Sequence, residues 1–371
     1  LNNLRGKTRF VIDKGKTGDF IRHKLIGLLE AGKLAELDSP AIEKAIESVY
    51  SDWLKGTPSA TWAVEFYAKI AGDSYAALVD KGELDAGLEL LHRWQASPLW
   101  SPQGPPKAVR LKIGYHTLRA LYLGGADSPL VLKVGQSRSI LDSVVAPEYA
   151  ILGWFAETLL QAKGSRDARE PASQVGALPS DQVTLYRLAT AHGLRLSGDA
   201  KSAQGLLPTL DDPKWNSSIL LERIELAKAL GDGPRAFNLV KRRLTGADAA
   251  TQKKLVAEMS EIVDTMKVWN MGGELLQTAR ATFSEPKDLG PYYHLAARAL
   301  YESRQCKQAI PLFENAFKMT PDAPQAAGSH FRLGKCWLAE KKPEAARQEW
   351  SKAVQLKDSL DRKSTRLNSS H

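Results

Sequence analysis

The chain has 371 residues, 43% of them hydrophobic and 25% charged, which is the composition of a folded protein rather than a disordered one. Its formal net charge of +9 lies mostly at the ends: residues 1–33 contribute +5 (eight basic, three acidic) and residues 361–371 contribute +2 (three basic, one acidic), which leaves +2 for the body. We therefore expect no nucleic-acid partner, which a basic body would favour, and no membrane span, because no apolar run approaches the roughly 20 residues required.

The first part of the chain is predicted to be irregular. Residues 1–18 are basic and glycine-rich with little apolar surface to bury, so we expect a mobile segment there. Residues 19–96 show apolar side chains at helical spacing. We expect an irregular helical region over this range, with helices that include 42–54 and 62–79.

A proline-rich segment interrupts the helical pattern at 97–107. Its prolines remove backbone donors and restrict the residue before each of them, so we expect a loop. Helical spacing resumes in a region from 108 to 147, in which one helix over 109–123 is ended by the pair Gly124 and Gly125.

From 148 to 360 the chain repeats one pattern. Glycine lies close to aspartate or proline between apolar runs, as expected where one helix ends in the left-handed conformation and the next begins. Small residues recur in the second helix of each unit at intervals of 35, 33, 37, 36 and 37 residues, at Ala168, Ala203, Ala236, Gly273, Ala309 and Ala346. A period of this length indicates stacked helical hairpins, so we expect an all-α array of antiparallel helix pairs over 148–360.

The last two units, 290–323 and 327–360, are the clearest. Each places small residues where two helices cross and aromatic residues in the groove between neighbours; the residues are Ala309, Phe313, Ala316 and Pro321, then Leu333, Gly334, Trp337, Ala346, Trp350 and Ala353. These units resemble the tetratricopeptide repeat (TPR) family, most clearly over 290–358 and not before 148. The first unit departs from the family pattern at Ala296, Ala297 and Leu300, and the second at Asp358. The resemblance implies a right-handed superhelix, a TPR-like α-solenoid, whose concave face holds peptides or partner segments.

The resemblance also implies candidate binding residues. In such repeats the fifth, ninth and twelfth residues of the first helix point into the concave face; in this sequence they are His294, Arg298 and Tyr301, then Phe331, Lys335 and Leu338. We hypothesise that Arg298 and Lys335 hold a carboxylate of an acidic or C-terminal peptide, with Tyr301 and Phe331 as apolar anchors. A solvated basic face without a ligand is the alternative.

No catalytic or cofactor motif is recognised. The run Lys14–Thr17 ends like a phosphate-binding loop, but Phe10 stands where that motif needs glycine. The histidines show no metal-ligand spacing and no Gly-x-Ser-x-Gly elbow occurs, so we expect no metal, no cofactor and no enzymatic activity. Cys306 and Cys336 fall on adjacent helices of the array, so they could form a disulfide or be two ordinary buried cysteines. We favour two ordinary buried cysteines.

The two ends do not read as native termini. Residues 361–371 match the translation of a common short-read sequencing adapter and the first residue is Leu1, so we interpret the chain as a bacterial gene fragment and leave the tail out of fold reasoning. Our leading hypothesis for its function is a non-enzymatic scaffold or adaptor that binds a protein or peptide partner, in either the cytoplasm or the periplasm. The alternative is the non-catalytic superhelical part of a truncated envelope enzyme, such as a soluble lytic transglycosylase. A helical regulatory or ligand-sensing domain is the third hypothesis.

Overall fold

The computed structural model describes the residues 60–96, 100–101, 103–161, 178–210 and 212–368. The expected mobile segment 1–18 and the expected helix over 42–54 lie outside them. Every regular element in the described ranges is a helix, which confirms the all-α prediction. The chain divides into two compact units, Leu1–Ile219 and Leu220–His371, and the boundary falls inside the expected array 148–360.

The described helices of unit 1 are α3 (Ala60–Asp80), α4 (Leu84–Gln95), α5 (Lys107–Gly124), α6 (Pro129–Gln136), α7 (Arg138–Val144), the 3-10 turn η2 (Pro147–Tyr149), α8 (Ile151–Gln161), α9 (Ser180–Leu196) and α10 (Ala200–Leu206). The predicted helices over 62–79 and 109–123 lie within α3 and α5. The described residues of the proline-rich segment form no helix before Lys107. The core is aromatic as well as aliphatic: Tyr75 is fully buried, and its hydroxyl lies 2.7 Å from Thr117 Oγ1.

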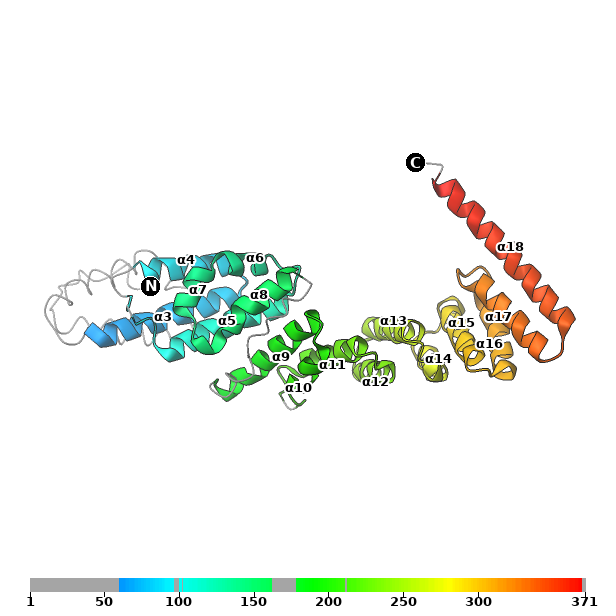
Figure 1. The fold of residues 1–371 in the computed structure, drawn as a ribbon, viewed down its shortest axis with the longest axis horizontal. Helices are drawn as coiled ribbons and strands as arrows, with labels where there is room; N and C mark the ends of the chain where they lie inside the picture. The colour runs from blue at the N-terminus through cyan, green and yellow to red at the C-terminus, as the bar shows by residue number, and fades with distance from the viewer. Residues whose placement is uncertain (1–59, 97–99, 102, 162–177, 211, 369–371) are drawn as a thin grey trace. The chain divides into compact units, whose positions relative to one another are not determined.

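Unit 2 is a row of antiparallel hairpins in which α13 pairs with α14, α15 with α16 and α17 with α18 (Figure 1). Its helices are α11 (Asn216–Ala229, which begins just before the boundary), α12 (Gly233–Arg243), α13 (Ala249–Thr265), the 3-10 turn η4 (Trp269–Met271), α14 (Gly272–Thr282), α15 (Pro286–Glu302), α16 (Cys306–Met319), α17 (Ala326–Ala339) and α18 (Pro343–Asn368). The backbone of α18 thus stays helical through residues 361–368, part of the tail that we left out of fold reasoning.

One backbone turn joins the two helices of each hairpin. Its central residue has a left-handed conformation. In all of these turns but the one at Lys267, the amide of the next residue donates to a carbonyl of the first helix five positions earlier, as Gln305 N does to Leu300 O at 2.8 Å. The left-handed residues have φ between 56° and 88° and are Gly82, Gly198, Gly231, Lys267, Arg304 and Lys341. The last five follow one another at intervals of 33, 36, 37 and 37 residues, so the turn repeats with the period of the array.

Aspartates begin two of the second helices, α10 and α12, as the turn composition predicts. The Asp199 side chain accepts a hydrogen bond from the amide of Ser202 at 3.1 Å, and the Asp232 side chain accepts one from the amide of Arg235 at 3.1 Å. Each carboxylate satisfies an amide that has no partner inside its helix, which is how a residue at this position stabilises a helix start. Turn and cap together are therefore encoded locally.

A small buried residue follows five positions after each left-handed residue; the set is Gly87, Ala203, Ala236, Gly272, Ala309 and Ala346. These residues lie at close helix contacts. A Cβ built on Gly87 would be 3.1 Å from Tyr75 Cδ2 on the other helix of its hairpin, and one built on Gly272 would be 2.5 Å from Ala299 Cβ on α15 of the next hairpin. The predicted Gly273 is wrong by one position, because this unit is 36 residues from the preceding one and Gly273 itself is exposed. Ala168 lies outside the described residues. The α3–α4 hairpin uses the same turn, so the pattern begins before residue 148.

Candidate functional site

The five predicted binding residues lie on the first helices of two neighbouring hairpins. His294, Arg298 and Tyr301 are on α15, and Phe331 and Lys335 are on α17, which packs beside it. Because the hairpins repeat every 37 residues here, equivalent positions of the two helices come into register. The structure brings only some of these side chains together.

His294 is not on the surface. Its side chain is 2% exposed, its Nδ1 lies 2.9 Å from Ser329 Oγ, and its ring meets the edge of the Phe317 ring with centroids 5.4 Å apart. Burial lowers the pKa of His294 to about 4, so the imidazole is neutral at pH 7. The assignment of His294 as a binding residue is therefore corrected, because the side chain packs between hairpins and does not reach a ligand.

Arg298 is already paired within the protein. Its Nη1 donates to Asp264 Oδ1 at 2.6 Å, its Nε lies 3.8 Å from Glu302 Oε1, and its guanidinium lies 4.9 Å from the centroid of the Trp269 ring. The proposed clamp of Arg298 and Lys335 is thus not assembled as expected, since Arg298 has two carboxylate neighbours and is only half-exposed.

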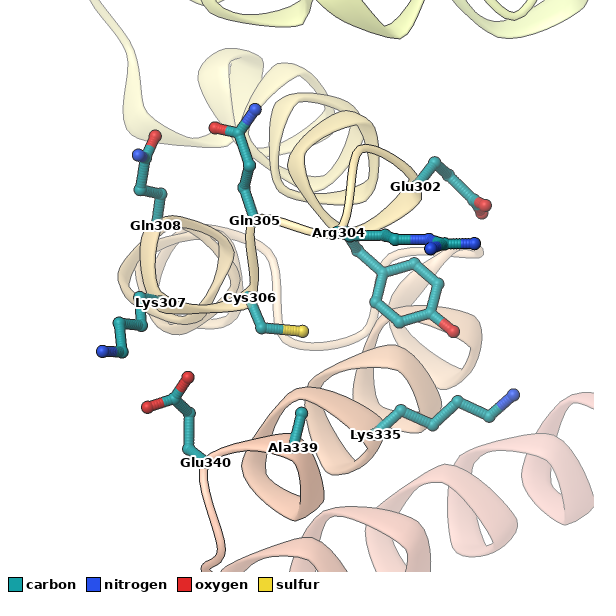
Figure 2. A pocket seen from close by; sticks show the side chains of 10 residues that line it. Glu302, Arg304, Gln305, Cys306, Lys307, Gln308, Lys335, Ala339 and Glu340 are labelled. Carbon is teal, nitrogen blue, oxygen red and sulfur yellow. The ribbon is translucent and has the colours of Figure 1, made fainter.

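A cleft of about 810 Å³ opens instead at the end of α15, where the turn to α16 faces the last turn of α17 (Figure 2). We call it the turn cleft. It is lined by Tyr301, Glu302, Arg304, Gln305, Cys306, Lys307, Gln308, Lys335, Ala339 and Glu340. It contains two of the predicted residues, Tyr301 and Lys335. In Figure 2 the side chains of Arg304 and Lys335 extend to the same side of the turn cleft.

Among the charged side chains that line the turn cleft, more cations than carboxylates lack an ion-pair partner within the described residues. Arg304, Lys307 and Lys335 are exposed, and none of them makes an ion pair within the part of the chain that the structure describes. Of the two carboxylates in the lining, Glu302 already lies between two arginines of the hairpins, which leaves Glu340. An anionic group entering here meets cations that no internal partner neutralises.

Sequence reasoning missed Arg304 because this residue lies in the turn and not on the first helix. It holds φ at 60°, a left-handed conformation that disfavours side chains with a Cβ and that glycine occupies in the hairpins α9–α10 and α11–α12. The turn pattern itself was the usable signal: Arg304 follows Lys267 by 37 residues and precedes Lys341 by 37.

An apolar face adjoins Lys335 on α17. Phe331 and Leu338 are 48% and 51% exposed, and they lie four residues before and three residues after Lys335, which places all three on one side of the helix. The ammonium of Lys335 lies 4.8 Å from the centroid of the Phe331 ring. This face therefore offers two exposed apolar side chains beside a cation, of which Phe331 is one of the two predicted apolar anchors.

Residues 294–360 match the family model described as "Tetratricopeptide repeat". The matched range runs from α15 into α18 and agrees with the 290–358 expected from the residues. The C-terminal hairpins are tetratricopeptide-like. A solved TPR domain, that of P58(IPK), aligns with 15% identity over 97% of this chain and 99% of that chain, with a TM-score of 0.24, a value too low to support any inference about shape. No curated protein matches the chain.

The TPR-like fold is consistent with a protein-interaction scaffold, since such hairpins expose their first helices to partners. Among the described residues, no group of three or more histidine, cysteine or acidic side chains is placed to hold a metal ion. No helix in the same ranges is long and apolar enough to cross a membrane.

Cys306 and Cys336 form a disulfide that links α16 to α17, with their Cα atoms 5.0 Å apart. The preference for two ordinary buried cysteines was therefore wrong. Cys306 lines the turn cleft, and Cys336 is fully buried. The bridge thus fixes the wall of the turn cleft to the helix that carries Lys335.

Proposed function

We propose that this chain is a non-enzymatic scaffold that binds an acidic or C-terminal segment of a partner protein at the turn cleft and along the adjoining face of α17. The unpaired cations Arg304, Lys307 and Lys335 support this proposal most strongly. A carboxylate can approach Arg304 and Lys335 from one side, while apolar side chains of the same segment cover Phe331 and Leu338. The accessory part of an envelope enzyme remains the alternative prediction.

The test uses fluorescein-labelled peptides measured by fluorescence anisotropy with the full chain. A panel of nonapeptides with aspartate or glutamate and one apolar residue near a free C-terminal carboxylate is compared with the same panel amidated at the C-terminus and with acids changed to amides. The free acidic peptides should bind tightest, and raising the salt should weaken them.

The double variant Arg304→Glu/Lys335→Glu should weaken binding about tenfold, the effect of two solvent-exposed charge contacts. The matched control is Lys287→Glu/Lys318→Glu, which changes the net charge equally at exposed sites outside the turn cleft. Equal losses in the two double variants would show that only overall charge matters and would remove the turn cleft from the proposal.

A further inference from the structure

Unit 1 contains a second cleft, which the TPR-like hairpins do not include. We call it the α7–α8 cleft; its volume is about 610 Å³, within the roughly 300–1,000 Å³ typical of small-molecule sites. It is bounded by α6, α7, η2 and α8. Its lining is Leu132, Val134, Gly135, Gln136, Arg138, Leu141, Asp142, Val145, Ala146, Pro147, Tyr149, Ala150, Leu152, Gly153, Ala156, Glu157 and Leu160.

The interior of the α7–α8 cleft is apolar and is kept open by small residues. Leu141 and Leu152 are buried residues of its lining, while Gly135 and Ala150 contribute no side chain large enough to fill it. Two large apolar side chains in the lining are exposed: Leu132 is 54% exposed and Leu160 is 49% exposed. An apolar ligand would cover both side chains, and removing this apolar surface from water would favour binding.

The charged part of the lining is a single ion cluster. Arg138 Nε lies 3.6 Å from Asp142 Oδ2, and Arg138 Nη1 donates to Glu157 Oε1, so the guanidinium bridges α7 and α8. A Cβ on Gly153 would lie 2.9 Å from Arg138 Cζ, which shows that the guanidinium rests directly on the backbone of α8.

This cluster is net negative. It holds one guanidinium against two carboxylates, and no other charged residue lines the α7–α8 cleft. Asp142 and Glu157 keep 70% and 47% of their side chains exposed, so both remain able to receive a donor. An anionic group would meet two carboxylates around one shared cation, whereas a cationic group would complete the charge balance.

We propose that the α7–α8 cleft is a second binding site, for a small molecule with an apolar chain and a cationic head. The apolar chain of the ligand lies between Leu132 and Leu160, and its cationic head reaches Asp142 and Glu157. This site stands on unit 1 alone and does not depend on peptide binding at the turn cleft.

The test compares n-octylamine, octan-1-ol and octanoate, three probes with one chain length and three head charges, titrated into the full chain. Binding is followed by NMR at the methyl groups of Leu132 and Leu160, so that octanoate held elsewhere does not register. Octylamine should bind at least tenfold tighter than octanoate. Each methylene added from hexylamine to octylamine should tighten binding about fourfold.

Two variants distinguish the contribution of the ligand's apolar chain to binding from that of its charged head. Asp142→Asn/Glu157→Gln leaves Arg138 as the only charge and should reverse the preference, so that octanoate binds tighter than octylamine. Ala150→Trp should fill the α7–α8 cleft and abolish binding of all three probes, whereas Leu123→Trp, at an exposed site on α5, should change nothing. Equal affinities for the three heads, or no saturable methyl shift with octylamine, would overturn the proposal.

Discussion

Replacing His294 by glutamine should remove a large pH dependence from the stability of unit 2. The buried imidazole has a pKa of about 4 in the folded chain, against 6.5 for a solvated histidine, mainly because burial penalises its charged form. An electrostatic contribution from His330, whose ring stacks on Phe317, lowers the pKa of His294 further. Glutamine is neutral throughout and can still bond to Ser329.

The sign follows from proton binding. Between pH 6.5 and pH 4 the unfolded chain binds a proton at residue 294 that the folded chain does not, so stability is full above pH 6.5 and falls as the pH falls towards 4. With these two pKa values the wild-type chain should lose about 2 kcal/mol more than His294→Gln between pH 7.5 and pH 5.0.

Urea unfolding at pH 7.5, 6.0 and 5.0 measures this difference, read by pulsed hydrogen exchange in α15 to α17 so that unit 2 is observed separately. NMR titration of the His294 ring gives the folded pKa directly. A gap between wild type and His294→Gln that stays constant within about 0.5 kcal/mol over this range would refute the assignment of a buried, neutral histidine.

Three further predictions concern the hairpins. Cys306→Ser/Cys336→Ser should cost about 3–4 kcal/mol, because the bridge closes a loop with a sequence separation of 30 residues, and a lower Tm on adding dithiothreitol to wild type but not to the variant would show this. Gly334→Ala should cost about 1–3 kcal/mol in chemical denaturation, since its Cβ would lie 2.3 Å from Trp350 Nε1 and would displace that ring. Arg304→Gly should instead raise stability by about 0.5–1 kcal/mol by removing a side chain from a left-handed turn.

Matched variants test the reasons behind these values. Gly328→Ala is the control for Gly334, because its Cβ would approach only the flexible end of Arg332, and it should be tolerated. Gly231→Ala is the counterpart of Arg304→Gly: its Cβ has open space around it, but its φ of 73° is left-handed, so it should cost about 1 kcal/mol. Similar effects for Gly328→Ala and Gly334→Ala, or a stabilising Gly231→Ala, would contradict this account.

The sequence by itself determined the hairpins and their period. Left-handed turn residues, aspartate caps and small residues act within about ten residues of chain, so their pattern predicts each helix pair without knowledge of its neighbours. For that reason the expected repeats at 290–358 agree with the family match at 294–360, and α5 contains its predicted helix. The one-residue error at Gly273 arose because the unit length varies between 33 and 37 residues, and only the crossing with Ala299 fixes the register.

The tertiary structure alone decided which side chains a ligand can reach. His294 is buried because Phe317 and Ser329, from two other helices, pack against its ring. Arg298 forms an ion pair with Asp264, which lies 34 residues earlier. The turn cleft likewise exists only because the turn at Arg304 faces the end of α17 from the next hairpin. Burial and charge pairing depend on contacts between helices, including helices of different hairpins, whereas turns and caps depend on contacts between residues close in the sequence, and a repeat pattern specifies only the latter.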